Sequence, residues 1–269
     1  MLMKKNIGFI GSGKMGGALI KGIISKNFNR KQIFVSDPAE GKRVAEEFGI
    51  NLTGSNSELV SNVDVVIIAV KPNRIFDVLD EISQAVNDEK LIISIAAGIK
   101  LEGIKVHLKN NGRLIRVMPN ICALVGQSAS CIFCGPKTTA DDREAAVALL
   151  SLVGRTAIIN DESLMDTVTG LSGSGPAYIF AAIEALADGA VKMGLDRQNA
   201  TLLAAQTVTG AAQMVLETKI HPEQLKDMVT SPGGTTIYGL SVLEQRGFRS
   251  ALIDAVAAAT ERSRDLGSR

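Results

Sequence analysis

A glycine-rich turn near the start of the chain constrains the fold more than any other feature. The apolar run Ile7–Ile10 predicts a buried strand, and it leads directly into the pattern Gly11-x-Gly13-x-x-Gly16. A helical spacing of apolar residues follows between residues 18 and 24. Strand, glycine turn and helix in this order are typical of a dinucleotide-binding motif, whose glycines allow a tight turn, close approach of the pyrophosphate and close packing of helix on strand. The alternative interpretation is a glycine turn without a ligand.

An acidic residue stands where such a motif needs one. Residues 32–38 predict a second strand that ends at Asp37, about 20 positions beyond the turn, where a carboxylate bonds the ribose hydroxyls of adenosine. A carboxylate there favours NAD(H), because it repels a 2′-phosphate. Lys42 and Arg43 follow within one helical turn and are placed to hold such a phosphate, while Asp37 is also placed to cap that helix. The sequence leaves NADP(H) and NAD(H) both open as cofactors.

Nearly continuous aliphatic segments recur through the first half of the chain. They span residues 63–70, 91–98 and 114–118, and helical patterns over residues 41–48, 74–85 and 101–109 alternate with them. Such segments are typical of strands buried on both faces of a parallel sheet. Strands over residues 131–134 and 156–160, with a helix over 138–153, are expected to complete the sheet. The alternation predicts an α/β domain of Rossmann-like, doubly wound type.

Small residues follow several of these predicted strands. Because ligands of doubly wound sheets lie at the carboxyl ends of the strands, these residues are candidates to lie against a nicotinamide ring. Ordinary turn residues are the alternative at each position. The predicted cofactor contacts outside the glycine turn include Ala69, Val70, Lys71, Pro72, Ala96 and Ala97.

The second half of the chain has a helical pattern without a convincing strand. Long helices are predicted over residues 176–193, 197–217 and 248–266, with many alanines and few charges between residues 181 and 212. A helix with little polar face is buried on nearly all sides. We therefore expect a helical subunit interface, with a buried core inside one chain as the alternative. The predicted domains are residues 1–160 and 161–269.

Two glycine-rich segments interrupt these helices. Residues 171–178 predict a glycine turn that opens a helix, with Pro176 in its first turn. Residues 226–237 form a loop rich in hydroxyls and glycines before another helix, and such a loop offers amides and hydroxyls to a small carboxylate. Simple N-capping by Ser231 or Thr235 is the alternative, although a cap needs only one such residue.

The composition argues against several classes of protein. The net charge is +1, aromatic residues make up 4% and Trp is absent, so no nucleic-acid partner is expected. No apolar stretch approaches the ~20 residues of a membrane span, and no signal peptide is expected. Cys131 and Cys134 are three residues apart on a predicted strand, where their thiols point to opposite faces, so no metal site is expected. A cytoplasmic location suits the unpaired thiols.

The residues favour hydride transfer to an imine. The sequence shows no Ser-His-Asp set, metal cluster or obvious carboxylate pair, and a nicotinamide cofactor would carry the chemistry. Reducing a ketone needs an acid for the alkoxide, whereas an imine nitrogen is already protonated near neutral pH. A site of backbone amides and hydroxyls can hold a carboxylate and orient the C=N carbon over a nicotinamide.

At this point the sequence resembles the Δ1-pyrroline-5-carboxylate reductases. The resemblance covers essentially the whole chain and includes the segments 7–16, 69–72, 94–98, 170–178 and 225–236. The Ser-Pro-Gly-Gly motif beginning at Ser231 is highly specific, whereas many dehydrogenases share the first glycine turn. The resemblance implies NAD(P)H-dependent reduction of pyrroline-5-carboxylate to L-proline, the last step of proline biosynthesis, in a dimer with intertwined helices or a ring of five dimers.

The resemblance also implies the roles of individual residues. Thr236 matches the threonine that bonds the ring nitrogen and relays its proton, Glu162 a position near bound proline, and Asn56 a contact to the adenosine ribose or its phosphate. Lys219 departs from the family, where many members carry Glu. The implied substrate contacts are Glu162, Ser231, Gly233, Gly234, Thr235 and Thr236, and the predicted cofactor contacts in the first glycine turn are Ile10, Gly11, Ser12, Gly13, Lys14, Met15 and Gly16.

Two other functions remain as alternatives. A hydroxyacid dehydrogenase of the related two-domain type would want a catalytic lysine on the helix after Pro176, but residues 179–190 contain none and Lys192 comes several turns later. A non-catalytic dinucleotide-binding regulator would keep the glycine turn and would have no need of the motif at residues 231–236.

Overall fold

The computed structural model describes residues 5–267. Packing divides them into two compact units: residues 5–174 with 257–267, which we call the sheet unit, and Gly175–Val256, which we call the helical unit. The last helix, α12 (Phe248–Gly267), contributes residues to both units. The sequence predicts a domain boundary after residue 160, and this boundary stays a prediction. In the structure, the first segment of the sheet unit extends to Ser174.

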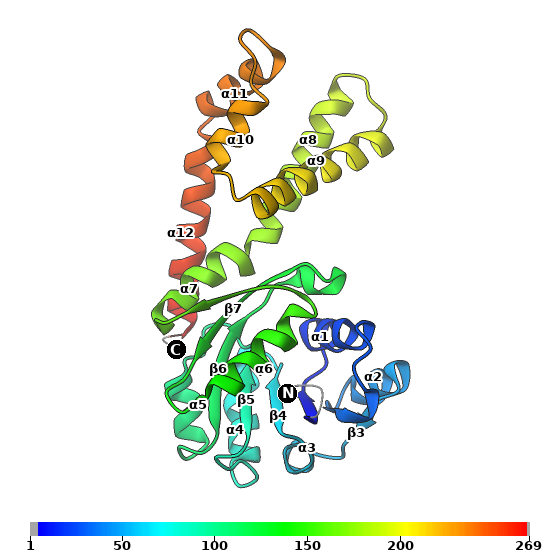
Figure 1. The fold of residues 1–269 in the computed structure, drawn as a ribbon, viewed down its shortest axis with the longest axis vertical. Helices are drawn as coiled ribbons and strands as arrows, with labels where there is room; N and C mark the ends of the chain where they lie inside the picture. The colour runs from blue at the N-terminus through cyan, green and yellow to red at the C-terminus, as the bar shows by residue number, and fades with distance from the viewer. Residues whose placement is uncertain (1–4, 268–269) are drawn as a thin grey trace. The chain divides into compact units, whose positions relative to one another are not determined.

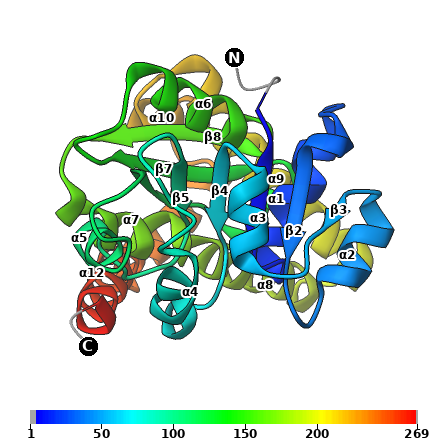
Figure 2. The ribbon, with the colours of Figure 1, turned by 90° about the horizontal axis from the view of Figure 1, so that it is seen from below.

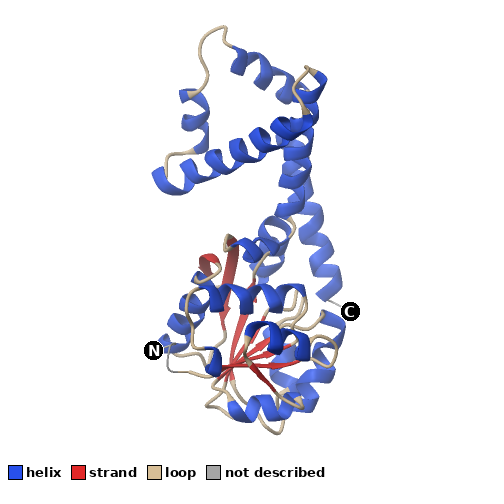
Figure 3. Ribbon diagram, turned by 90° about the vertical axis from the view of Figure 1, so that its right-hand side faces the viewer, coloured by secondary structure: helices blue, strands red, loops and turns tan. Residues whose placement is uncertain are grey.

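The sheet unit is built on one mixed, mainly parallel sheet, drawn red in Figure 3. Its strands are β1 (Ile7–Ile10), β2 (Ile33–Ser36), β3 (Asn51–Leu52), β4 (Val65–Ile68), β5 (Leu91–Ser94), β6 (Arg113–Met118), β7 (Ser128–Cys134) and β8 (Gly154–Ile159). Their spatial order is β3-β2-β1-β4-β5-β6-β7-β8, and the β6–β7 pair is antiparallel. The strand order reverses between β1 and β4, which is the switch point where ligands of such sheets bind.

Two apolar cores cover the two faces of the sheet. One core packs β1 and its neighbours against α1 (Lys14–Ser25), α2 (Gly41–Phe48) and α6 (Ala140–Ser151). The other packs the opposite face against α3 (Asn56–Asn62), α4 (Ile75–Ile82) and α5 (Leu101–His107). Figure 2 shows α6 on one side of the strands and α4 and α5 on the other. Burial of β4 on both faces explains why its sequence, VVII, lacks any polar alternation.

Short helical turns connect these elements. Pro72–Arg74 follows β4, Glu162–Leu164 precedes α7 (Met165–Val168), and further 3₁₀ turns span Arg30–Gln32 and Ile121–Val125. The predicted strand over residues 131–134 is confirmed as part of β7, and burial raises the pKa of the Cys131 thiol. Within residues 5–267, no helix is both long and apolar enough to cross a bilayer.

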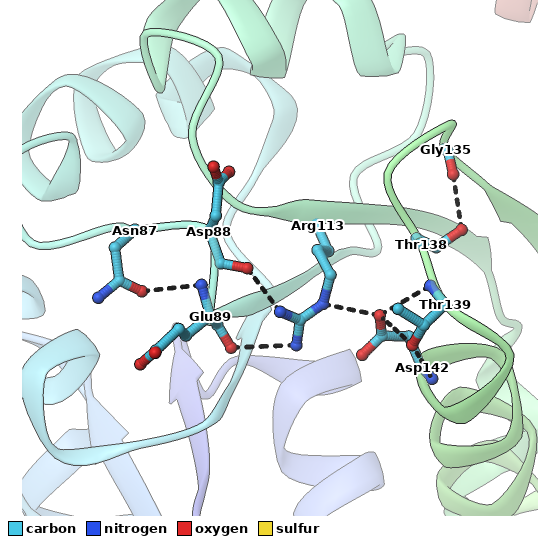
Figure 4. A network of polar contacts seen from close by, with 8 residues as sticks. All are labelled: Asn87, Asp88, Glu89, Arg113, Gly135, Thr138, Thr139 and Asp142. Atoms are coloured by element: carbon cyan, nitrogen blue, oxygen red, sulfur yellow. Dashed lines mark hydrogen bonds and ion pairs between the residues drawn. The ribbon is translucent and has the colours of Figure 1, made fainter.

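An ion pair between the half-buried Arg113 and the buried Asp142 joins the beginning of β6 to α6, as Figure 4 shows. The Arg113 Nε donates to Asp142 Oδ2 at 2.7 Å, and its other nitrogens donate to the carbonyls of Asp88 and Glu89 at 2.5 and 3.0 Å. The same Asp142 oxygen accepts from the backbone N–H and the hydroxyl of Thr139, which caps α6. The loop before β5 and the first turn of α6 are thereby tied to one guanidinium.

We expect Asp142→Asn to lower the free energy of unfolding by about 2 kcal/mol at pH 7, because it leaves the charge of Arg113 without a carboxylate. Burial raises the pKa of Asp142, but hydrogen bonds from Thr139 and Arg113 outweigh it, so the pKa lies below its usual value. The stability that this carboxylate supplies is therefore present above about pH 4 and is lost as the pH falls through the folded-state pKa.

Urea unfolding at several pH values measures this effect. The exposed neighbour Asp141 provides the matched control, Asp141→Asn, which should change stability little. Equal stability losses in the two variants would contradict the assignment of the stabilisation to the Arg113–Asp142 pair.

The helical unit has a very small core of its own. Its elements are α8 (Gly175–Lys192), α9 (Arg197–Thr218), α10 (Pro222–Met228), α11 (Thr235–Gln245) and the first part of α12. α8 and α9 run side by side (Figure 1), and the core between them is limited to Ala187, Ala200 and Ala204 with a few half-buried neighbours. Large apolar side chains remain exposed, among them Leu202 at 63% and Leu203 at 56%. The alternative of a buried core inside one chain is therefore wrong for the described helices.

The predicted helix start is confirmed, because α8 begins at Gly175 with Pro176 in its first turn, but the residues before it are helical and do not form a separate glycine turn. Thr169–Gly173 forms a wide π turn that runs on into α8, with the Ser174 N–H donating to the Thr169 carbonyl at 2.9 Å. Pro176 has no N–H to offer the Ser172 carbonyl, and the Asn120 side chain donates to that carbonyl instead, at 3.0 Å. An Asn from another segment thus replaces the bond that the proline removes.

Candidate functional site

The glycine turn after β1 lies at the switch point of the sheet. Gly11 adopts φ +91°, a conformation that favours glycine, and its N–H donates to the Ser36 carbonyl at 2.9 Å. A Cβ on Gly16 would lie 2.5 Å from the Gly11 carbonyl oxygen, so the first turn of α1 needs a glycine to approach the strand. A Cβ on Gly13 would meet nothing within 4 Å. The three glycines therefore provide the turn, the helix packing and an open face, as the motif predicts.

The N-terminus of α1 is open to an anion. Gly13 is its N-cap residue and supplies no side-chain hydrogen bond, so the first N–H groups of a 12-residue helix lack a side-chain cap. Helix N-termini of this kind bind the pyrophosphate of dinucleotides. The geometry fits the diphosphate that the sequence predicts.

A cavity of about 480 Å³ lies beside this turn and spans the switch point. It collects many of the predicted cofactor contacts, while Ser12 and Lys14 line a neighbouring hollow and Met15 and Gly16 lie in α1 behind the turn. The predicted contacts that line the cavity are Ile10, Gly11, Gly13, Asp37, Asn56, Ala69, Val70 and Lys71. Arg74, Asp77 and Glu81 also line it, and the sequence analysis did not single them out.

The remaining predicted cofactor contacts follow β4 and β5 at the same edge of the sheet. Pro72 and Ala97 line a second cavity of about 580 Å³, while Ala96 is 4% exposed and belongs to the core that packs against α4 and α5. The register places Ile68 opposite both Ile10 and Ser94, so the strand ends that precede these residues lie in line with the glycine turn. The predicted nucleotide contacts thus gather along one edge of one unit.

Asp37 is the anchor of the glycine turn. Its Oδ2 accepts from the Ser12 N–H at 2.7 Å and from the Ser12 hydroxyl at 3.1 Å. Its Oδ1 accepts from the N–H groups of Ala39 and Glu40 at 2.9 and 3.0 Å, just before α2 begins. Burial raises the pKa of Asp37, but these hydrogen bonds outweigh it and hold the pKa below its usual value. The carboxylate stays ionised at neutral pH and fixes the turn to the end of β2.

Glu162 is tied to the sheet unit by two hydrogen bonds. Its Oε1 accepts from the Leu101 N–H at 2.7 Å, at the start of α5, and from Arg116 Nη1 at 3.1 Å. Arg116 is 3% exposed, and burying its charge requires such a partner. The sequence analysis did not predict this pair, although a charged residue inside an aliphatic strand is a signal that could have indicated a buried partner. The role of Glu162 as a substrate contact stays a prediction.

The predicted carboxylate loop belongs to the helical unit and has the expected local form. Gly233 adopts φ +64°, and Gly234 is the N-cap residue of α11 without a side-chain cap. Simple capping by Ser231 or Thr235 is therefore not found. Among residues 5–267, the hydroxyls of Ser231, Thr235 and Thr236 have no hydrogen-bond partner. Free hydroxyls beside an uncapped helix N-terminus suit a small carboxylate.

Comparison with known proteins agrees with both halves of the chain. Residues 162–266 match the family model described as pyrroline-5-carboxylate reductase dimerisation, and residues 6–98 match the model described as NADP oxidoreductase coenzyme F420-dependent. The pyrroline-5-carboxylate reductase of Methanosarcina acetivorans is 50% identical over 268 residues, covering 98% of this chain and 99% of the relative. That of Escherichia coli is 42% identical over 267 residues, covering 98% and 99%.

Solved structures show the same likeness. Pyrroline-5-carboxylate reductase from Coxiella burnetii superposes with a TM-score of 0.92 at 36% identity, covering 97% of this chain and 98% of that one. Plasmodium falciparum pyrroline carboxylate reductase with NADP bound gives a TM-score of 0.88 at 33% identity, covering 98% and 99%.

The glycine turn, the open helix N-terminus and the cavity at the switch point define a dinucleotide-dependent oxidoreductase with a Rossmann-like domain. Residues 162–266 of the chain match the dimerisation model of one family within this class of oxidoreductases. The chain belongs to the pyrroline-5-carboxylate reductase family. The predicted family, fold class and NADP(H) or NAD(H) cofactor are confirmed, and homo-oligomer formation follows from the dimerisation match.

Proposed function

We propose that this chain reduces the C=N bond of Δ1-pyrroline-5-carboxylate with NAD(P)H and releases L-proline, the last step of proline biosynthesis. The observation that carries the proposal is the pairing of an open nucleotide turn after β1 with a loop of unbonded hydroxyls before α11. The curated relatives, 42–50% identical over nearly the whole chain, bear the name of this activity.

The sheet unit holds the dinucleotide. The N–H groups at the start of α1 bind its pyrophosphate, and the residues after β4 and β5, from Ala69 to Pro72 and at Ala96 and Ala97, form the surface for the nicotinamide. When bound, NAD(P)H supplies a hydride to the imine carbon. Asp37 keeps the glycine turn in place for this purpose through Ser12.

The loop before α11 holds the substrate. Gly233 and Gly234 allow the carboxylate to approach the free N–H groups in the first turn of α11, and the hydroxyls of Ser231 and Thr235 bind it. Thr236 bonds the ring nitrogen and relays its proton. The imine carbon accepts the hydride, its double bond to nitrogen becomes a single bond, and the protonated nitrogen becomes the amine of proline. Glu162 is proposed to lie near the ring.

The assembly is proposed to be a dimer, with five dimers as the larger form. The exposed apolar side chains of α8 and α9 supply the surface that the partner subunit buries. The cytoplasm is the proposed location, because all three cysteines are free.

The deciding experiment follows the absorbance of NAD(P)H during incubation with pyrroline-5-carboxylate. We expect oxidation of the nicotinamide with stoichiometric formation of proline. Turnover with a 2-oxoacid in place of the imine would favour the hydroxyacid dehydrogenase alternative. Dinucleotide binding without turnover of either substrate would favour the regulator.

A further inference from the structure

A smaller cavity adjoins the cavity of about 480 Å³ at the end of β2 and shares part of its lining. It measures about 270 Å³ and is lined by residues of the β2–α2 loop, of the segment before α3, and by Glu81 from α4. In a Rossmann-like domain the ribose of the adenosine lies beyond the end of this strand. A 2′-phosphate, which distinguishes NADPH from NADH, would extend from that ribose.

Three of the hydrogen-bond donors around this small cavity are already engaged, while the Ser55 hydroxyl at the start of α3 accepts from the Glu58 N–H at 3.1 Å. The Ser36 hydroxyl donates to Asn56 Oδ1 at 2.8 Å, and the Thr53 hydroxyl donates to the Val35 carbonyl at 3.2 Å. The Gly54 N–H donates to a Glu58 carboxylate oxygen at 2.7 Å. A phosphate has only acceptor oxygens at this pH, and it would have to replace these bonds.

Asn56 is held in one orientation by Glu81. The Asn56 Nδ2 donates to Glu81 Oε2 at 2.7 Å, while its Oδ1 accepts from Ser36. The amide therefore presents a donor toward a carboxylate that is exposed and lines both cavities. Glu81 lies on α4, 25 residues from Asn56 in sequence, which is why no local pattern indicates it.

Asp37 has no acceptor position to spare. A carboxylate offers about four lone-pair sites, and four protein donors on Ser12, Ala39 and Glu40 fill them. Its negative charge still faces the small cavity, which it lines. Glu81 has a single hydrogen bond to its side chain among residues 5–267, and its remaining lone pairs are available to ribose hydroxyls.

The nearby cations do not offset these two carboxylates. Among the described residues that line the small cavity there is neither Lys nor Arg. The sequence analysis considered Lys42 and Arg43 as phosphate ligands. Lys42 lines neither cavity, and Arg43 pairs with Glu40 at 2.7 Å and with Glu47 at 2.6 Å. Arg74 pairs with Asp77 at 3.4 Å, and both Lys71 and Arg74 line the larger cavity but not the small one.

We infer that Glu81, held by Asn56, determines cofactor specificity: its carboxylate accepts the ribose hydroxyls of NADH and repels the 2′-phosphate of NADPH, so this reductase uses NADH in preference. The inference rests on the proposed function where it concerns the cofactor used in turnover. The selectivity itself is a property of binding, and it can be measured without any imine substrate.

The test is a titration of the full-length protein with NADH and NADPH, followed by the fluorescence of the reduced nicotinamide. The wild type should bind NADH about tenfold more tightly than NADPH, because the phosphate adds nearly two negative charges beside two carboxylates. Glu81→Gln keeps the side-chain size and an acceptor oxygen. It should tighten NADPH binding about tenfold and change NADH binding far less.

Asp77→Asn is the matched control. Asp77 lies one turn earlier on α4 and lines the larger cavity, but it does not line the small one. It should leave the ratio of the two affinities unchanged. Equal gains for NADPH in both variants, or tighter binding of NADPH than NADH by the wild type, would overturn the inference and would indicate that Lys71 holds the phosphate.

Turnover assays separate this inference from the proposed function. If the predicted order of affinities is found and pyrroline-5-carboxylate is not reduced with either cofactor, the proposed function fails and the specificity stands. If the imine is reduced, with kcat/KM higher for NADPH, the specificity fails and the function stands.

Discussion

Replacing Thr236 by Ala is expected to lower kcat/KM for pyrroline-5-carboxylate by about 100-fold or more, the size of effect that a positioned proton-transfer group supplies. Thr236 lies in the first turn of α11, beside an N-cap glycine, and its hydroxyl is not engaged by any other residue between 5 and 267. Removing that hydroxyl takes away the proposed partner of the ring nitrogen. It removes no helix cap, because Thr236 does not cap α11.

The same variant should bind NADH as the wild type does, because the nucleotide contacts belong to the sheet unit. Thr236→Ser, which keeps the hydroxyl, is the matched control and should retain most of the activity. An equal loss of dinucleotide affinity and of turnover in Thr236→Ala would contradict the division of roles between the two glycine-containing segments.

Gly16→Ala is expected to have the second large effect, a loss of both stability and dinucleotide binding. The added Cβ would lie 2.5 Å from the Gly11 carbonyl oxygen, which is backbone and cannot rotate away. The first turn of α1 must therefore move off the strand, at a cost of about 1–3 kcal/mol for overpacking. The displaced helix N-terminus no longer meets the pyrophosphate, so NADH affinity should fall at least tenfold.

Gly13→Ala distinguishes packing from ligand contact. Its Cβ would meet no protein atom within 4 Å, and its backbone φ of −60° suits any residue. This variant should keep the thermal stability of the wild type and lose dinucleotide affinity. Thermal unfolding and fluorescence titration of the two variants measure both properties, and a stable Gly16→Ala protein with full affinity would contradict the packing argument.

The sequence predicted the sheet unit well because its strands are aliphatic on both faces. β1, β4 and β5 are short, fully buried and mainly apolar runs bounded by turn residues, and α2 was predicted with its observed bounds. The strand β3 was missed because two residues give no periodicity, and α3 was missed because only Leu59 and Val60 of its seven residues are buried and its sequence, NSELVSN, is otherwise polar.

The site was predicted less completely than the fold. The glycine turn and Asp37 follow one another at a fixed spacing, so a local pattern reveals them. That Asp37 is already satisfied by Ser12 and the start of α2 depends on distances that no spacing conveys. The pairs Asn56–Glu81 and Arg116–Glu162 join residues 25 and 46 positions apart, and only the folded chain brings them together.

The alanine core of the helical unit bears on how this protein persists in a cell. Three buried alanines contribute little of the apolar burial that offsets chain entropy, while leucines on α9 stay in contact with water. The helical unit, Gly175–Val256, therefore depends on association with a second copy for its free energy of folding. A higher intracellular concentration favours association and therefore the folded form. We expect the protein to be degraded more slowly when it is synthesised faster, and more quickly when it is dilute.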